Sequence, residues 1–214
     1  DIVKNWIENT KIPKQIRISI DGELKDLDEN WLNQIIEEAC TGHKNHVEPR
    51  SIYNSVFKNL YDGIKVDDLI KTLIMTSKTF IEKDPLYAKV TAQLLLYSIR
   101  KEVLGRHVQA SEAKETYKSY FPRFIEKGIQ AGVLSSELNS FDLEFLGETI
   151  NPERDLQFGY LGLQTLYDRY FLIDRNDSFS KEGRRIELPQ IFFMRVAMGL
   201  AIREKNKSER AAEF

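Results

Sequence analysis

The sequence has 214 residues, of which 42% are hydrophobic and 30% charged, and its formal net charge is −2. A chain of this length and composition can bury a core as one large domain or two small ones. Because no excess of positive charge exists to neutralise phosphates, nucleic-acid binding is not expected. The sequence shows no signal peptide and no run of about eighteen apolar residues, which argues against secretion and membrane insertion and favours a cytoplasmic location.

The first part of the chain predicts an arm followed by a β-hairpin. Residues 1–15 are expected to form a short N-terminal arm. Apolar and polar residues then alternate from Ile16 to Ile20, as in a half-buried strand. Asp21-Gly22 is typical of a tight turn, so the residues that follow can return as a second strand.

Four helices are expected after this hairpin, because apolar residues recur at helical spacing between stop signals. They are predicted over residues 29–40, 49–60, 67–83 and 86–104. Asp28 is a candidate N-cap of the first helix, and Pro49 suits the first turn of the second. Gly105 is expected to end the fourth helix.

The second half of the sequence predicts more helices and one further hairpin. Helical spacing continues from about Tyr117 to Leu134, and short helical turns are expected after Ser135 and Phe141. Residues 154–202 predict a helix, a hairpin and a second helix. The hairpin would pair residues 171–173 with 185–188 around turn residues 176–183, and the second helix would open with Pro189. The expected fold class is therefore mainly α with two small hairpins.

Neither the single cysteine nor the histidines predict a chemical site. Cys40 closes an amphipathic helix, so we expect a buried core thiol rather than a nucleophile. His43 and His46 lie in a polar loop with Glu48 nearby, but a fourth metal ligand is missing. We expect no catalytic residue and no metal site in this chain. A single cysteine also fits a reducing compartment.

The segment from Arg154 to Ile202 carries a family resemblance. Its helix YLGLQTLYDRYFL is followed, after the hairpin, by ELPQIFFMRVAMGLA. This order resembles the segment that precedes the catalytic barrel in the large (alpha) subunit of ribonucleotide reductases, the class I type especially. The residues that carry the signature are Pro189, Gln190, Met194, Arg195, Val196, Ala197, Gly199 and Leu200. Arg154 and Asp155 match an arginine–aspartate pair of the family, for which we favour a local ion pair or cap over substrate contact.

Residues 16–105 resemble the ATP-cone, the regulatory nucleotide-binding domain at the N-terminus of many of these reductases. The closest local matches are residues 61–65, the turn at 84–87 and the helix end at 98–105. Thr72, Arg100 and Lys101 match positions that help to bind nucleotide in functional cones. The family's phosphate-binding Lys-Arg pair is replaced by Ser19 and Ile20, and Trp31 stands in place of a lysine. We therefore expect a degenerate cone that binds neither ATP nor dATP.

The resemblance implies a division into an N-terminal arm (1–15), a cone-like domain (16–105) and the helical N-terminal part of the catalytic domain (106–214), with the barrel absent. It also implies the reduction of ribonucleoside diphosphates to deoxyribonucleotides by radical chemistry. The family uses one cysteine as the radical and a pair as the reductant, all in the barrel, so a chain with one cysteine cannot supply the reaction.

The implied partners are a barrel-carrying remainder of the large subunit and a radical-generating small subunit, in an oligomeric enzyme. The radical cofactor is expected in that small subunit, and no cofactor in this chain. The chain could be a truncated piece of the subunit or one half of a naturally split subunit. The alternative is a stand-alone helical regulatory or protein-interaction module. Exposed apolar surface on the helix opened by Pro189 would favour an absent barrel over the stand-alone module.

Overall fold

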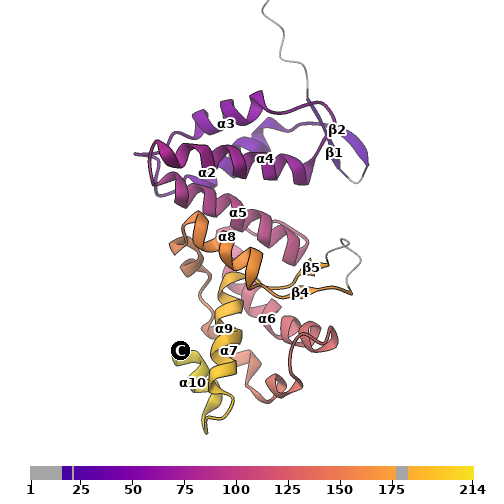
Figure 1. The fold of residues 1–214 in the computed structure, drawn as a ribbon, viewed down its shortest axis with the longest axis vertical. Helices are drawn as coiled ribbons and strands as arrows, with labels where there is room; N and C mark the ends of the chain where they lie inside the picture. The colour runs from indigo at the N-terminus through magenta and orange to yellow at the C-terminus, as the bar shows by residue number, and fades with distance from the viewer. Residues whose placement is uncertain (1–15, 21, 177–182) are drawn as a thin grey trace, which may run out of the picture. The chain divides into compact units, whose positions relative to one another are not determined.

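The computed structural model describes residues 16–20, 22–176 and 183–214. The expected arm at 1–15, Asp21 in the first turn and residues 177–182 of the second turn lie outside the described residues. The chain divides into two compact units, residues 1–87 and residues 88–214 (Figure 1).

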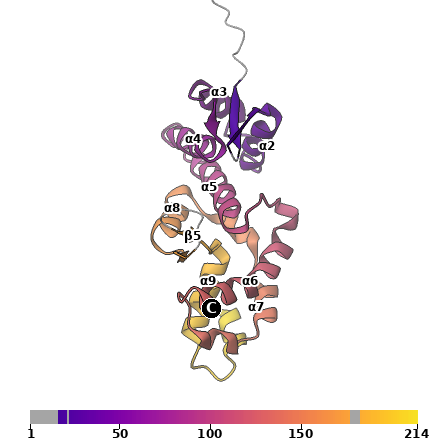
Figure 2. The same ribbon diagram turned by 90° about the vertical axis from the view of Figure 1, so that its right-hand side faces the viewer.

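The first unit contains a small sheet with helices gathered around it (Figure 2). Strand β1 (Arg17–Ile20) pairs antiparallel with β2 (Glu23–Asp26), which confirms the predicted hairpin. Strand β1 also pairs in parallel with the two-residue strand β3 (Ile64–Lys65), so the strand order is β2-β1-β3. The sequence did not predict this third strand.

A side-chain clamp holds β3 beside β1. The Asp62 carboxylate accepts hydrogen bonds from the Arg17 backbone N–H at 2.9 Å and from Arg17 Nε at 3.1 Å. Arg17 Nη2 lies 2.5 Å from the second carboxylate oxygen of Asp62. The Gly63 N–H then donates to the Arg17 carbonyl at 2.8 Å. These contacts fix a turn beside a residue 45 positions earlier in the chain.

The helices of the first unit begin as their sequence signals predict. They are α2 (Glu29–Ala39), α3 (Pro49–Lys58) and α4 (Val66–Thr79), followed by the 3₁₀ turn η1 (Phe80–Glu82). The Asp28 carboxylate accepts the N–H groups of Asn30 and Trp31, which confirms the predicted N-cap. The core of this unit comprises buried aliphatic side chains, among them Ile18, Leu32, Ile36, Ile52, Ile64, Leu69 and Leu73.

The second unit is helical apart from one two-stranded ribbon. Helix α5 (Tyr87–Leu104) enters it from the first unit, and the 3₁₀ turn η2 (Ala110–Glu112) follows. The next elements are α6 (Ala113–Gln130), η3 (Ser136–Ser140), α7 (Leu143–Thr149) and η4 (Pro152–Gln157). The last are α8 (Tyr160–Arg169), β4 (Ile173–Asp174), β5 (Arg184–Arg185), α9 (Pro189–Ala201) and α10 (Lys207–Glu213).

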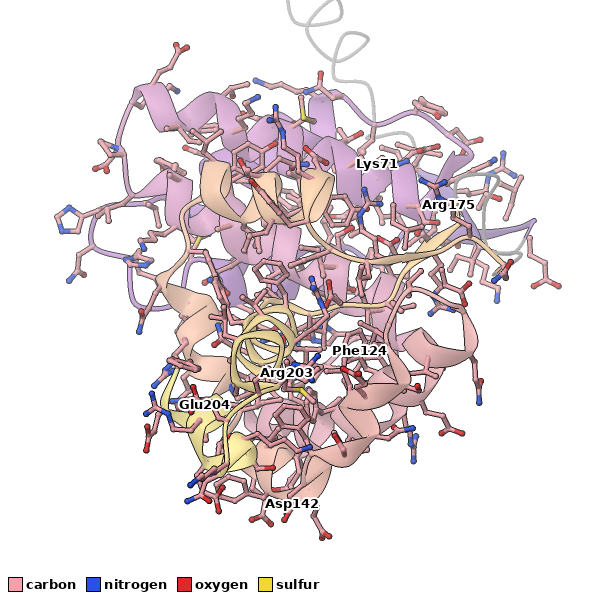
Figure 3. The ribbon with its side chains drawn as sticks, turned by 60° about the horizontal axis from the view of Figure 1, so that its bottom comes forward. Lys71, Phe124, Asp142, Arg175, Arg203 and Glu204 are labelled. Atoms are coloured by element: carbon pink, nitrogen blue, oxygen red, sulfur yellow. The ribbon has the colours of Figure 1, made fainter. Side chains whose placement is uncertain are left out.

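Strands β4 and β5 pair antiparallel, Ile173 with Arg185 and Asp174 with Arg184, which confirms the second predicted hairpin. Helix α6 contributes large side chains to the core of the unit, including the fully buried Phe121 and Phe124, of which Phe124 is labelled in Figure 3. The predicted mainly α fold class is thus confirmed. No helix of the described residues is both long enough and apolar enough to cross a membrane. The division between the two compact units falls after Tyr87 in the sequence, whereas the predicted domain division at residue 105 stays a prediction.

Candidate functional site

The positions that match nucleotide-binding positions of functional cones lie in both units. In the first, the hydroxyl of Thr72 donates to the Asp68 carbonyl within α4 at 2.8 Å, an ordinary helix hydroxyl contact. Ser19 and Ile20 are half-buried on β1 and supply no charge. Arg100 and Lys101 belong to the second unit, near the end of α5. The expectation that Thr72, Arg100 and Lys101 no longer bind nucleotide stays a prediction.

Arg100 takes part in a buried polar group, here called the Asp155 cluster. Tyr117 donates its phenolic hydrogen to Asp155 at 2.5 Å, and the Gln190 amide donates to the other carboxylate oxygen at 3.0 Å. The Arg100 guanidinium donates to the Tyr117 oxygen at 3.2 Å and lies 3.4 Å from Asp155. The cluster therefore joins α5, α6, η4 and α9 within the second unit.

Asp155 is completely buried, which explains why it needs these donors. Burial raises the pKa of its carboxyl, while the bonds from Tyr117, Arg100 and Gln190 partly offset that rise. Burial by itself would lower the pKa of Arg100, but Tyr117 and Asp155 outweigh it and raise that pKa. The local ion pair or cap predicted for Asp155 is wrong, because its partners lie 35 to 55 positions away.

A second group, the Glu102 cluster, ties the hairpin to α5 and α8. The Glu102 carboxylate accepts the Tyr167 hydroxyl at 2.8 Å and the Arg185 backbone N–H at 3.0 Å. The Arg185 guanidinium lies 3.6 Å from the centre of the Tyr167 ring and donates to the Tyr167 carbonyl. Arg184 Nε donates to the Glu102 carbonyl at 2.6 Å. The short ribbon is thereby held by side chains rather than by strand pairing alone.

The signature arginine of α9 has a structural partner. Arg195 Nε lies 2.5 Å from a carboxylate oxygen of the fully buried Glu187, whose other oxygen accepts the Leu172 N–H at 2.8 Å. Burial raises the pKa of Glu187, and the Arg195 guanidinium opposes that rise. Arg195 thus compensates a buried carboxylate in the segment between β5 and α9.

Helix α9 also exposes an apolar face to solvent, here called the α9 stripe. It consists of Phe193, Val196 and Leu200, which are 45%, 39% and 65% exposed. Their spacing places them on one side of the helix. Phe158 stacks on Phe193 with ring centres 6.2 Å apart, and Leu161 nearby in the sequence is 78% exposed. Exposed apolar surface of this kind on a regular helix indicates a contact site.

The remaining candidate groups show no reactive geometry. Cys40 is completely buried, and burial raises the pKa of its thiol to about 12, as expected for a core residue. The Glu48 carboxylate accepts the Ser51 hydroxyl at the start of α3, and the His46 N–H donates to the His43 carbonyl. Across the described ranges, no group of three histidine, cysteine or acidic side chains is placed to hold a metal ion.

Comparison with known proteins matches the part of the chain that contains the α9 stripe to a family model. Residues 156–214 match the family model of the ribonucleotide reductase all-alpha domain. The chain is 38% identical over 197 residues to ribonucleoside-diphosphate reductase subunit alpha of Chlamydia muridarum, an alignment that covers 92% of this chain and 18% of that relative. The chain belongs to the large-subunit family of ribonucleotide reductases. It corresponds to the N-terminal part of that subunit.

Two further relatives of the same family agree. The alpha subunit of Helicobacter pylori is 40% identical over 158 residues, which are 72% of this chain and 18% of the relative. That of Enterobacteria phage T4 is 26% identical over 184 residues, or 86% of this chain and 23% of the relative. The chain thus spans only 18% of the length of the first curated relatives it matches. The matched family region includes α8, the hairpin, α9 and the α9 stripe.

Sequence reasoning found the α9 signature but missed both the Asp155 cluster and the Glu102 cluster. Arg100 matches a nucleotide-binding position of functional cones, and in this chain its guanidinium lies against Tyr117 and Asp155. Asp155 follows the charged residues Glu153 and Arg154, so its sequence neighbours give no signal of a buried carboxylate or of its donors.

Proposed function

We propose that this chain serves as a non-catalytic, structural N-terminal part of a ribonucleoside-diphosphate reductase large subunit. Its task would be to support a catalytic barrel that reduces ribonucleoside diphosphates. The α9 stripe carries the proposal, because it lies in the family-matched region and leaves apolar surface for another part of the enzyme to cover.

The cysteine content supports the non-catalytic role. The chain has one cysteine, and its thiol is completely buried with a pKa raised to about 12. Radical and dithiol chemistry need more than one accessible sulfur, so the reaction would belong to the remainder of the large subunit. The radical cofactor would belong to a separate small subunit, and the assembled enzyme would be an oligomer. A cytoplasmic location is part of the proposal, since a free thiol suits a reducing compartment.

Reconstitution tests this function. The chain would be mixed with a second polypeptide that carries the remaining part of the large subunit and with the small subunit, and the formation of deoxyribonucleoside diphosphate would be measured. We expect product only in the complete mixture. Turnover by the chain alone would refute the assigned roles, and failure to bind the second polypeptide would favour the stand-alone module.

A matched pair of variants locates the contact. Leu200→Asp places a charge on the α9 stripe, and we expect it to abolish binding and product formation while the chain stays folded. Leu24→Asp changes another exposed leucine, on β2 (52% exposed against 65% for Leu200), and should leave both unchanged. Equal losses for the two variants would argue against the α9 stripe as the docking surface.

A further inference from the structure

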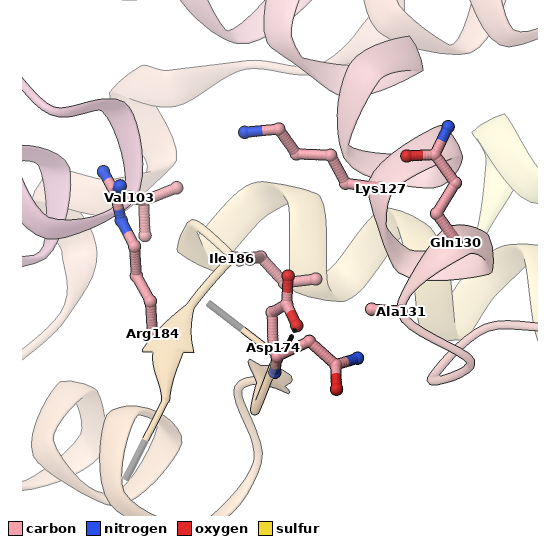
Figure 4. Close-up of a pocket in the computed structure, with 8 residues that line it drawn as sticks. Val103, Lys127, Gln130, Ala131, Asp174, Arg184 and Ile186 are labelled. Carbon is pink, nitrogen blue, oxygen red and sulfur yellow. Dashed lines mark hydrogen bonds between the residues drawn. The ribbon is translucent and has the colours of Figure 1, made fainter. Parts of the chain in front are cut away.

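A pocket of about 350 Å³ lies in the second unit, apart from the Asp155 cluster and the α9 stripe (Figure 4). It lies between the end of α5, the C-terminal turn of α6 and the hairpin. Its lining residues are Val103, Lys127, Gln130, Ala131, Asp174, Asn176, Arg184 and Ile186. The volume is at the lower end of the range for small-molecule sites, roughly 300–1,000 Å³.

Two cations border this pocket. Lys127 extends from α6 toward the side of the pocket on which Arg184 lies (Figure 4). Within the described ranges, no hydrogen bond or ion pair engages the Lys127 ammonium. Arg184 is anchored by the bond from its Nε to the Glu102 carbonyl, so its guanidinium is held at the wall. A fixed guanidinium beside an unengaged ammonium suits a phosphate group.

The rest of the lining has a different chemistry. The carboxylate of Asp174 borders the pocket and accepts the Asn176 backbone N–H through one oxygen at 2.9 Å. Its second oxygen, together with the Gln130 side-chain amide, can bond hydroxyl groups. Val103 and Ile186 are buried and supply apolar contact. Asp174 would contribute no favourable contact to a bare anion, and Lys127 would contribute little to the binding of an uncharged sugar.

We propose that this pocket binds a small sugar phosphate. The phosphate would lie against Lys127 and Arg184, a sugar hydroxyl would donate to Asp174, and the carbon face would rest on Ile186. This ligand class uses both the charged and the hydroxyl-accepting parts of the lining, and the proposal is independent of the reductase assignment.

Calorimetric titration of the 214-residue chain with glucose 6-phosphate tests the proposal, with glucose and inorganic phosphate as partial probes. We expect glucose 6-phosphate to bind about tenfold or more tightly than either partial probe. Lys127→Gln should weaken it about tenfold or more, since a charge-assisted bond is lost. Lys114→Gln, an exposed lysine on α6 outside the pocket, should have no effect. Asp174→Asn should weaken glucose 6-phosphate but not inorganic phosphate.

Three results would overturn the proposal, with circular dichroism used to check that each variant is folded. The first is no binding of glucose 6-phosphate at about 10 mM, a concentration at which even weak sites fill. The second is an equal loss in Lys127→Gln and Lys114→Gln, which would indicate non-specific attraction. The third is inorganic phosphate binding as tightly as glucose 6-phosphate, which would exclude a role for the sugar.

Discussion

Asp155 and Glu187 are both fully buried carboxylates, and each faces an arginine and neutral donors. The carboxylate oxygens accept hydrogen bonds from donors on several helices and loops. Each carboxylate therefore fixes the relative position of those elements. A buried ion pair adds little net stability over an apolar replacement of the same shape, but removing one partner leaves the other charge unpaired. These two side chains are therefore sensitive positions.

Asp155→Ala is expected to lower the free energy of unfolding by about 3–5 kcal/mol, because Arg100 would keep a buried charge without its carboxylate. Urea denaturation followed by circular dichroism measures the change. Arg154→Ala is the matched control, since its side chain is exposed, and should stay within about 0.5 kcal/mol of the parent chain. A loss below about 1 kcal/mol for Asp155→Ala would contradict the importance of the cluster.

The buried tyrosines predict instability at alkaline pH. Burial raises the pKa of Tyr117, Tyr120 and Tyr167, and the carboxylates of Asp155 and Glu102 add to the rise at Tyr117 and Tyr167. The folded pKa of each phenol lies above its unfolded value of about 10, so the folded chain binds more protons in that interval. Stability is therefore complete below about pH 10 and falls as the pH rises further.

Urea midpoints measured from neutral to strongly alkaline pH, together with tyrosinate absorbance, test this dependence. The late part of the tyrosinate signal should appear together with unfolding. Complete ionisation of all tyrosines near pH 10 in a folded chain would contradict it.

Elements whose signals are local could be predicted from the sequence. Asp28 caps α2, and Pro189 opens α9, because both act within one helical turn. Strand β3 could not be predicted, since it has two residues and depends on the bond between Asp62 and Arg17. The donors to Asp155, Arg100 among them, could not be predicted for the same reason, because nothing local in the sequence specifies a donor tens of residues away.

The hairpin of the second unit depends on Gly183. Its φ is +87°, and a Cβ there would lie 2.5 Å from the Asp174 carbonyl oxygen. Gly132 also has a positive φ, +71°, but a Cβ there would meet nothing within 4 Å. Both positions disfavour an L side chain by about 1–2 kcal/mol, and only Gly183 adds a steric clash with backbone.

Gly183→Ala should therefore destabilise the chain more than Gly132→Ala in thermal or urea unfolding. It should also speed hydrogen exchange of the Ile186 N–H, which donates to the Leu172 carbonyl at 3.0 Å beside the hairpin. Equal effects of the two substitutions would show that the hairpin tolerates a shift of its backbone.

At the scale of the whole molecule, the family and the mainly α fold were predicted from the sequence and are confirmed, whereas the loss of nucleotide binding stays a prediction. Two phosphate contacts of a functional cone are absent at Ser19 and Ile20, and the nearby Arg17 is bound bidentately by Asp62. Each charge-assisted contact contributes about 1.5–3 kcal/mol, so the pair accounts for about two to four decades of affinity.

We therefore expect no ATP or dATP binding at the cone-like positions. Calorimetry on the chain checks this. A one-to-one complex tighter than about 100 μM would contradict it if Thr72→Ala or Lys101→Ala abolished binding and the neighbouring surface variant Lys71→Ala did not.

Because Cys40 is fully buried, the reactivity of its thiol can report how often the first unit opens. A thiol that is fully covered and stays protonated at neutral pH cannot react with an alkylating reagent until the first unit opens around it. The rate of modification at low reagent concentration thus measures how often that unit opens, without any introduced label. In mixtures with a cysteine-rich partner, the Cys40 thiol of the folded chain should not react with the reagent. Any rapid loss of free thiols would therefore come from the partner alone.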